Sequence, residues 1–553
     1  MFKSWFNSLK SKNVKSKWFS RNFAKPEIVS LEERVTPAQT VSISYLNGIL
    51  TLKSDTLAGE TNTFQVSQIT QTGTKIQFTG SGGTIFNSTV PNTVGNGTAN
   101  AEIDAKNLSN FNQILVQGGL GDDLTTFGTL DGNILASSNQ NNFSFEVDVV
   151  TFSGGGSGGA DTLNISGPVT IKQNGTFTTD STSTVQPNAN LDSLDIGPLG
   201  GIYSSGSGNI RLIADGLNTS DLTISSGGTI STGSGSVYLR SGASGNIRTN
   251  GNAITTIGGP ITFDSNVLLE SSTVFSTGLG LGGIDFNGLI AGSTASSENL
   301  TINSSGSLVF LNSVGSSILP LGSITLGSQQ PSSVTFSGDV YAKSFQATVQ
   351  GAFTSSGTLS LNDISGLSLT TTGASGTVTF GTPGTANPVI TTSNKGSVAI
   401  NNSAALTLNG NLNLDGAFSQ TGTGITNLGS SGVIGQLDIN TNDSPILFTS
   451  AVLLNQDIAV NSNSLGLVGF GKDITFSSTI DGANNIQTTS GTGNTTISGN
   501  IGSKVSPLAI LVNSTNKLTV SGTVNADSFT VTSATNAVQF KGVQTYDQLA
   551  GLN

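Results

Sequence analysis

Three-residue apolar–polar–apolar segments recur along this chain, separated by Ser, Gly, Asn or Thr. They occur, for example, at residues 300–302, 308–310, 324–326, 334–336, 406–408 and 412–414. Their period of two is that of a β-strand, but strands of three residues are too short to hold an independent flat sheet. Wound into coils, such strands pair with the coils above and below, and their inward side chains form aliphatic stacks. The pattern predicts an all-β chain in which residues 185–553 form a repetitive β-solenoid.

The composition fits this architecture. Glycine accounts for 72 of the 553 residues, and only 10% of residues are charged, whereas average proteins have roughly 7% glycine and about a quarter charged residues. Gly and Asn allow the left-handed backbone that sharp corners need. Like charges one coil apart would lie about 4.8 Å from each other, so stacked coils favour few charges. At about 20 to 25 residues a coil, residues 185–553 predict roughly 15 to 18 coils in a rod of roughly 70 to 90 Å.

Longer blocks of the solenoid region are duplicated. Residues 284–286 are echoed by 474–476, residues 314–321 by 501–508, and residues 335–345 by 519–529. The offsets are 190, 187 and 184 positions, in the same order along the chain. Colinear copies with small deletions indicate duplicated blocks, as in other repeat proteins.

Cysteine and histidine are both absent. Disulfides, thiolate or His-ligated metal sites and nucleophiles activated by His are therefore excluded. We expect no catalytic, cofactor-binding or metal-binding residues, and no enzymatic activity. One enzymatic alternative stays open, because some parallel β-helices cleave acidic polysaccharides with Asp, Lys and Arg clusters on one face. The basic residues that would serve are scattered along the sequence: Arg211, Arg240, Arg248, Lys343 and Lys395. The sequence also shows no close carboxylate pair of the kind that glycoside hydrolases need.

Residues 1–40 form a separate segment. The first 34 residues carry eight Lys or Arg and three Glu, whereas the remaining chain carries 13 basic and 29 acidic residues. Phe2, Trp5, Phe6 and Leu9 would share one face of a short helix, which favours an export or membrane-surface element over a disordered basic tail. The acidic body is a poor nucleic-acid binder. No apolar run reaches the roughly 18 residues of a transmembrane helix.

Residues 31–38 read Leu-Glu-Glu-Arg-Val-Thr-Pro-Ala. This resembles the Leu-Glu-x-Arg-x-Thr-Pro-Ala signature near the start of many large cell-surface or secreted proteins of planctomycete bacteria. The resemblance implies export of the chain, with the segment up to about Ala38 as leader or processing sequence.

Residues 41–184 form a Gly-rich β region that opens with a hairpin, since Asn47-Gly48 separates two apolar runs and favours a tight turn. Residues 118–124 and 156–163 resemble the glycine-aspartate nonapeptides of the repeats-in-toxin family, which implies calcium at Asp122, Asp123 and Asp161. The two copies stand 39 positions apart without a tandem partner, so a plain turn between strands is the favoured interpretation. A calcium-stabilised module remains an alternative.

Residues 406–418 and 542–546 resemble the repeats of filamentous-haemagglutinin-like and autotransporter-passenger adhesins. The resemblance covers about two thirds of the chain and implies a secreted, right-handed parallel β-helix that works as a stalk or adhesive surface. We therefore expect a non-enzymatic extracellular or cell-surface protein with cell-surface components or glycans as partners. Self-association through an uncapped C-terminal coil is a further expectation, and a carbohydrate-binding or polysaccharide-degrading β-helix is the alternative.

Overall fold

The computed structural model describes residues 39–547 except 55–61, 69–73, 112, 118–123, 128–148, 154–161, 166–167, 172–175, 180–192, 205, 216–218, 252–253, 328, 385–387 and 464–468. Residues 39–553 form one unit, separate from residues 1–38, so the basic leader and its signature lie outside the described residues. The described part is almost entirely β-strand, with one short 3₁₀ helix, η1 (Ala105–Asn107). No helix of this part is long and apolar enough to span a membrane.

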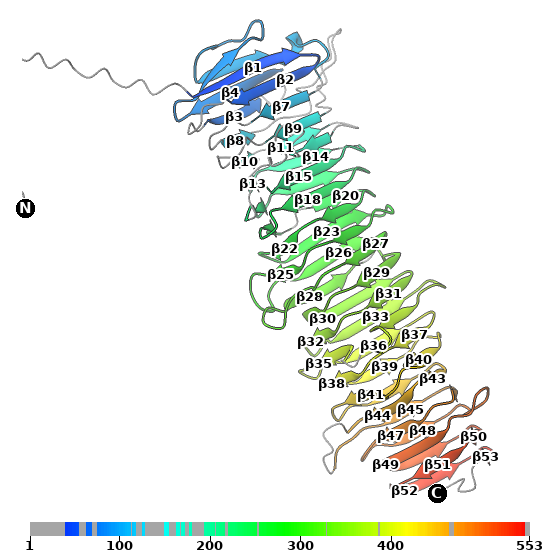
Figure 1. The fold of residues 1–553 in the computed structure, drawn as a ribbon. Coiled ribbons are helices and arrows are strands. Elements are labelled where there is room, and N and C mark those ends of the chain that lie inside the picture. The colour runs from blue at the N-terminus through cyan, green and yellow to red at the C-terminus, as the bar shows by residue number, and fades with distance from the viewer. Residues whose placement is uncertain are drawn as a thin grey trace, which may run out of the picture. The chain divides into compact units, whose positions relative to one another are not determined.

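Residues 149–546 form a parallel β-solenoid in which the chain visits three faces in turn (Figure 1). We call these faces A, B and C, in the order in which each coil visits them. Face A consists of β9 (Val149–Ser153), β12 (Thr176–Thr178), β15 (Ile210–Ala214), β18 (Val237–Ser241), β21 (Ile261–Phe263), β24 (Ile284–Phe286), β27 (Ser307–Phe310), β29 (Ser333–Phe336), β31 (Ala352–Ser355), β34 (Val378–Phe380), β37 (Leu406–Leu408), β40 (Thr426–Leu428), β43 (Val452–Leu454), β46 (Ile480–Asp481), β50 (Val524–Ala526) and β53 (Gln544–Tyr546). A bridge at Ile501 joins β46 to β50. The all-β parallel solenoid predicted from the triplets is thereby confirmed.

Faces B and C are parallel ladders of the same kind. Face B consists of β8 (Leu124–Phe127), β10 (Thr162–Ile165), β13 (Ser193–Ile196), β16 (Leu222–Ile224), β19 (Asn246–Thr249), β22 (Asn266–Leu269), β25 (Ile290–Gly292), β32 (Leu359–Leu361), β35 (Ile390–Thr392), β38 (Leu412–Leu414), β41 (Gln436–Thr441), β44 (Asp457–Asn461), β47 (Ile486–Thr489) and β51 (Ser528–Val531). Face C consists of β11 (Pro168–Ile171), β14 (Gly201–Ser204), β17 (Thr229–Thr232), β20 (Ile254–Thr256), β23 (Thr273–Gly278), β26 (Leu300–Ser304), β28 (Leu321–Leu326), β33 (Leu367–Thr371), β36 (Val398–Asn401), β39 (Phe418–Gln420), β42 (Ile446–Phe448), β45 (Ile474–Phe476), β48 (Thr495–Ile497) and β52 (Ala534–Phe540). Two long strands, β30 (Val340–Val349) and β49 (Ala509–Val520), bend from face B onto face C and pair on both.

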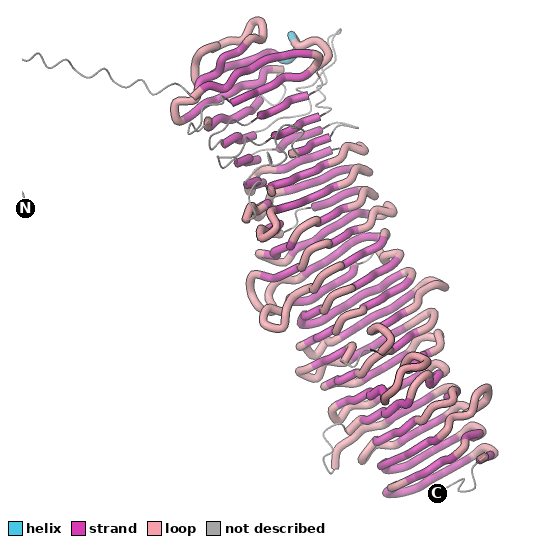
Figure 2. The backbone as a smooth tube through the Cα atoms, in the orientation of Figure 1, coloured by secondary structure: helices cyan, strands magenta, loops and turns pink. Residues whose placement is uncertain are grey.

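Coil length varies along the stack. On face A, Val334 pairs with Phe353, 19 positions on, whereas Val378 pairs with Leu406, 28 positions on. Fourteen strands of face A, β15 to β53, follow residue 185, close to the lower end of the expected 15 to 18 coils. Figure 2 shows that the difference in length lies in the loops between strands.

The core is formed by the outer two residues of each triplet, which point inward and are buried, while the central residue points outward. On face A the inward column contains Phe263, Phe286, Phe310 and Phe336, one per coil. Their ring centroids are 4.7, 5.0 and 4.3 Å apart with nearly parallel planes. Identical side chains in register thus stack along the solenoid, as parallel pairing dictates.

The corner between faces C and A is lined inside by hydroxyl side chains. The Thr232, Thr256 and Thr277 hydroxyls each donate to the carbonyl oxygen of a glycine just ahead, at 2.5 to 3.2 Å. Glycine is required there because a Cβ on Gly259 would lie 1.7 Å from the Gly235 carbonyl oxygen of the coil before. Several coils further along the same corner, Asn402 and Gln420 are also fully buried and polar. The corners therefore hold buried polar groups that hydrogen-bond locally.

A mainly antiparallel region lies on the N-terminal side of the solenoid. Its antiparallel pairs join β1 (Thr40–Leu46) to β2 (Ile49–Ser54), β3 (Thr63–Gln68) to β4 (Lys75–Ser81), and β4 to β6 (Asn100–Asp104), whereas β5 (Ile85–Ser88) pairs with β1 in parallel. Asn47 and Gly48 both have positive φ in the β1–β2 turn. Through β2 this region pairs with β7 (Gln113–Gln117), which pairs with β9. The parallel ladders thus begin before residue 185 and run across it, since β10 pairs with β13 and β12 with β15.

The duplicated blocks occupy different faces. Residues 284–286 form β24 on face A, whereas their copy at 474–476 is β45 on face C. Likewise Thr335 lies on β29 of face A, and its counterpart Thr519 lies on the face-C half of β49. The copies are therefore displaced by one face. A single strand with its corner is the interchangeable unit, because all three faces require the same alternation of inward and outward residues.

Candidate functional site

Among the described residues, no group of three or more Asp or Glu side chains is arranged to hold a metal ion. The proposed calcium residues Asp122, Asp123 and Asp161 lie outside the described residues.

Two of the scattered arginines meet on the outside of face A. Arg211 lies over the ring of Tyr238, one coil further on, with its guanidinium carbon 4.1 Å from the ring centroid. Arg240 pairs with Asp215 at 2.8 Å. The Tyr238 hydroxyl donates to Asp264 on the next coil. Side chains 25 to 27 positions apart in sequence are thus in contact on neighbouring coils of this face.

The other basic residues pair elsewhere. On face B, Arg248 bonds Asp221 at 2.6 Å and Glu270 at 3.2 Å, one coil to either side. At another corner the Lys395 ammonium lies 3.7 Å from Asp415. Lys343 is exposed on β30. These contacts join neighbouring coils, and they leave the five basic residues distributed over separate faces.

Face A also brings two carboxylates onto neighbouring coils. Burial raises the pKa of Asp264, but hydrogen bonds from Tyr238 and from Asn287 at 2.8 Å outweigh it and lower the pKa overall. Burial alone raises the pKa of Asp285. The register pairs Thr262 with Asp285, so the two carboxylates are diagonal neighbours, which places their side chains roughly 7 to 8 Å apart. A carboxyl pair with opposite pKa shifts is the pattern of an acid–base pair, although both Asp264 oxygens are already hydrogen-bonded.

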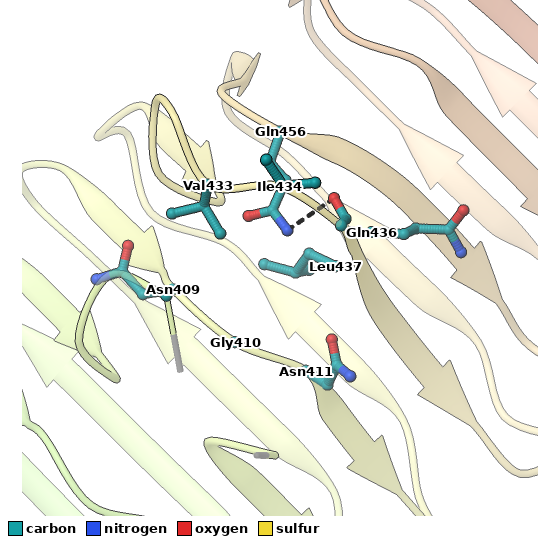
Figure 3. Close-up of a pocket in the computed structure, with 10 residues that line it drawn as sticks. Asn409, Gly410, Asn411, Val433, Ile434, Gln436, Leu437 and Gln456 are labelled. Atoms are coloured by element: carbon teal, nitrogen blue, oxygen red, sulfur yellow. Dashed lines mark hydrogen bonds between the residues drawn. The ribbon is translucent and has the colours of Figure 1, made fainter. Parts of the chain in front are cut away.

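A pocket of about 200 Å³ lies at the corner between faces A and B (Figure 3). Unequal loops create it. Residues 409–411 connect β37 to β38 with a short turn, whereas residues 429–435 on one neighbouring coil and residues 381–389 on the other are longer connections. The short turn therefore lies lower than the raised loop at residues 429–435, and Gly384 of the other neighbouring coil also lines the site. We call this site the corner pocket; it is lined by Gly384, Asn409, Gly410, Asn411, Val433, Ile434, Gly435, Gln436, Leu437 and Gln456.

Hydrogen bonds fix the walls of the corner pocket. Asn409 donates to the Gly381 carbonyl at 3.0 Å and accepts from the Ser430 hydroxyl at 2.5 Å, so it joins the raised loop to the coil that contains Gly381. Gln456 Nε2 donates to the Gly435 carbonyl at 3.0 Å, the contact drawn in Figure 3. The raised loop turns through Gly429, Gly432 and Gly435, all with positive φ. The pocket is therefore built by tied loops.

A second hollow of about 280 Å³ lies on face C. It is lined by Thr325, Leu326, Gly327, Gln330, Gln346 and Thr348. Gln330 accepts a hydrogen bond from Thr372 at 2.9 Å and folds its loop over the face. Like the corner pocket, it contains amide and hydroxyl groups and no ionisable side chain.

The sequence indicated none of the pocket residues. The available signal is the changing distance between triplets: residues 408 and 412 are close, whereas 428 and 436 are further apart. These distances predict a pocket only when it is known which corner loops lie on neighbouring coils.

Comparison with known proteins finds no matching family model, no matching curated protein and no matching solved structure.

Proposed function

We propose that this chain is a non-enzymatic extracellular or cell-surface protein whose solenoid acts as a stalk or adhesive surface. The main support is the outer surface of face A. There Thr335, Thr354, Thr379 and Thr407 lie in register on successive coils. A face lined by small hydroxyl side chains suits a solvated support rather than a reaction site.

The corner loops supply the contact surface in this proposal. Ile257, Leu279 and Leu281 are 72%, 85% and 89% exposed at the corner between faces C and A. Their loops are adjacent, since the Gly258 N–H donates to the Thr277 carbonyl at 2.7 Å. Clustered exposed aliphatics favour protein or cell-surface contact.

Binding of the full chain to cells tests the adhesive part. We expect saturable binding that falls severalfold in the triple variant Ile257→Ser, Leu279→Ser, Leu281→Ser. Leu199→Ser, at an 83% exposed leucine of another loop, serves as the control. Equal binding by all three proteins would contradict adhesion through this corner. Location is tested separately by protease treatment of intact producing cells, where an exported chain is cleaved and an internal chain is protected.

Polysaccharide cleavage is the second candidate function, favoured by the Asp264–Asp285 pair. A calcium-stabilised module is a third, and calorimetric titration of the full chain with calcium tests it, because absence of heat at millimolar calcium removes it.

A second copy of the chain is also a proposed partner. Among the described strands, β52 pairs only with β49 and β53 only with β50. Val538 on β52 and Val543 just before β53 are 46% and 72% exposed. Exposed valines beside strands with a single described neighbour favour edge-to-edge pairing with another copy. Sedimentation of the wild type against Val538→Lys tests it, and only the wild type is expected to form dimers.

A further inference from the structure

We propose that the corner pocket binds one neutral saccharide unit. This inference rests on the proposed function only in taking a glycan as the partner, and it names the site and the class of sugar. The residues that line the pocket determine which ligands fit.

The lining excludes charged ligands. None of its ten residues is ionisable, whereas charged ligands are held most strongly by ionised partners, anions by Arg or Lys and metal cations by several carboxylate oxygens. It also contains no aromatic ring, so a nucleobase would lack a stacking platform. At about 200 Å³ it is smaller than the roughly 300 to 1,000 Å³ of drug-sized sites. One small neutral polar molecule fits these limits.

The free polar atoms suit sugar hydroxyls. The Asn411 oxygen accepts from the Asp438 N–H at 2.8 Å, which leaves its Nδ2 without a hydrogen-bond partner among the described residues. Gln456 uses its Nε2 atom, at 3.0 Å, to bond the Gly435 carbonyl, and its Oε1 atom remains as an acceptor beside the pocket (Figure 3). The Gln436 amide extends away from the pocket and bonds Asp438 at 2.8 Å. A hydroxyl both donates and accepts, so it satisfies such a mixed set of amides.

The apolar wall suits the C–H face of a sugar ring. Figure 3 shows Val433, Ile434 and Leu437 on the side of the pocket formed by the raised loop. Ile434 is fully exposed, which is unfavourable for an isolated aliphatic side chain in water. A ring seated against it would remove that surface from water. Because Asn409 and Gln456 already hold the walls, binding needs little reordering, which favours affinity for a small ligand.

Saturation-transfer NMR on the full chain tests the proposal. The probes are the methyl glycosides of glucose, galactose and mannose, together with N-acetylglucosamine; glucuronic acid and glucosamine serve as charged counterparts. We expect saturable binding of at least one neutral probe and none of the charged pair. Absence of binding by every neutral probe, or equal binding by the charged sugars, would overturn the inference.

Two variants locate the binding. Ile434→Ser and Val433→Ser each remove part of the apolar wall; each is expected to weaken binding by about threefold to tenfold. Ile364→Ser, at a 69% exposed isoleucine of another loop, is the matched control and is expected to change nothing. Ile434 and Ile364 are exposed and Val433 is half-buried, so the fold is expected to survive, and equal melting curves check this. Unchanged affinity in both pocket variants would place the sugar elsewhere. Cell binding and protease protection of the same variants report on the proposed function independently.

Discussion

Gln420 Nε2 donates to Asn402 Oδ1 at 2.8 Å inside the corner between faces C and A, where both side chains are fully buried. The Gln420 oxygen accepts from the Thr449 and Ser450 N–H groups of the next coil, each at 3.0 Å. One amide therefore links three coils in the interior. Its removal would leave several buried polar groups without partners.

Gln420→Met keeps the volume and deletes these bonds. We expect a local loss of about 3 kcal/mol, and hence roughly 100-fold faster hydrogen exchange at the Thr449 and Ser450 amides. Exchange suits this test because a repeat protein opens locally and its global unfolding need not be two-state. Gln350→Met, at an exposed glutamine, is the control. Equal exchange in both variants would show that the buried amide contributes nothing.

The phenylalanine column predicts a contrast between adjacent residues. Phe310 is buried between Phe286 and Phe336, whereas Leu311 is 50% exposed. Phe310→Ala is expected to cost about 3 to 5 kcal/mol through lost burial and a cavity. Leu311→Ala is expected to cost less than about 1 kcal/mol. Hydrogen exchange at the backbone amides of β27 measures both losses locally, and similar exchange in the two variants would contradict the stacked core.

Acid should weaken the corner that follows face B. A backbone hydrogen bond from Lys395, at 2.7 Å, is the main cause of the lowered pKa of Asp415. A backbone bond from Gly471, at 2.9 Å, likewise lowers the pKa of Asp443. A carboxyl whose pKa is lower when folded stabilises the fold fully above its unfolded pKa of about 3.9, and this contribution is lost as the pH falls through the folded pKa.

The double variant Asp415→Asn, Asp443→Asn removes both titrating groups. Its melting temperature is therefore expected to fall less than that of the wild type between pH 5 and pH 2. Asp547→Asn is the control, because its exposed carboxylate makes no hydrogen bond to any described residue. If the melting temperature of the double variant fell as much as that of the wild type between pH 5 and pH 2, a role for this pair would be contradicted.

Face A gives a direct test of enzymatic activity. We expect the wild type to release no reducing ends from neutral or acidic polysaccharides, in line with the proposed non-enzymatic function. Activity that disappears in both Asp264→Asn and Asp285→Asn, but persists in Asp438→Asn on face B, would instead establish the carboxylate pair as a catalytic site.

The triplets predicted the architecture because alternating burial is a local property that one strand carries by itself. The lateral neighbours of each strand could not be predicted in the same way. Arg211 and Tyr238 are far apart in sequence, and their contact depends on a coil of 27 residues between Ile210 and Val237. On face A, paired residues of successive coils lie 19 to 33 positions apart, so spacing alone does not show which outward side chains meet. The corner pocket depends on the same unknown, since it arises from loops on three successive coils.

The displacement of the duplicated blocks by one face bears on how such a chain can lengthen. Insertion of one strand with its corner would preserve every inward column, but all later side chains would rotate by a third of a turn about the solenoid axis. Insertion of three such units would restore the original direction. The number of strands between two surface sites therefore sets the angle between them, and sites can be redirected in evolution without any change to the residues that compose them.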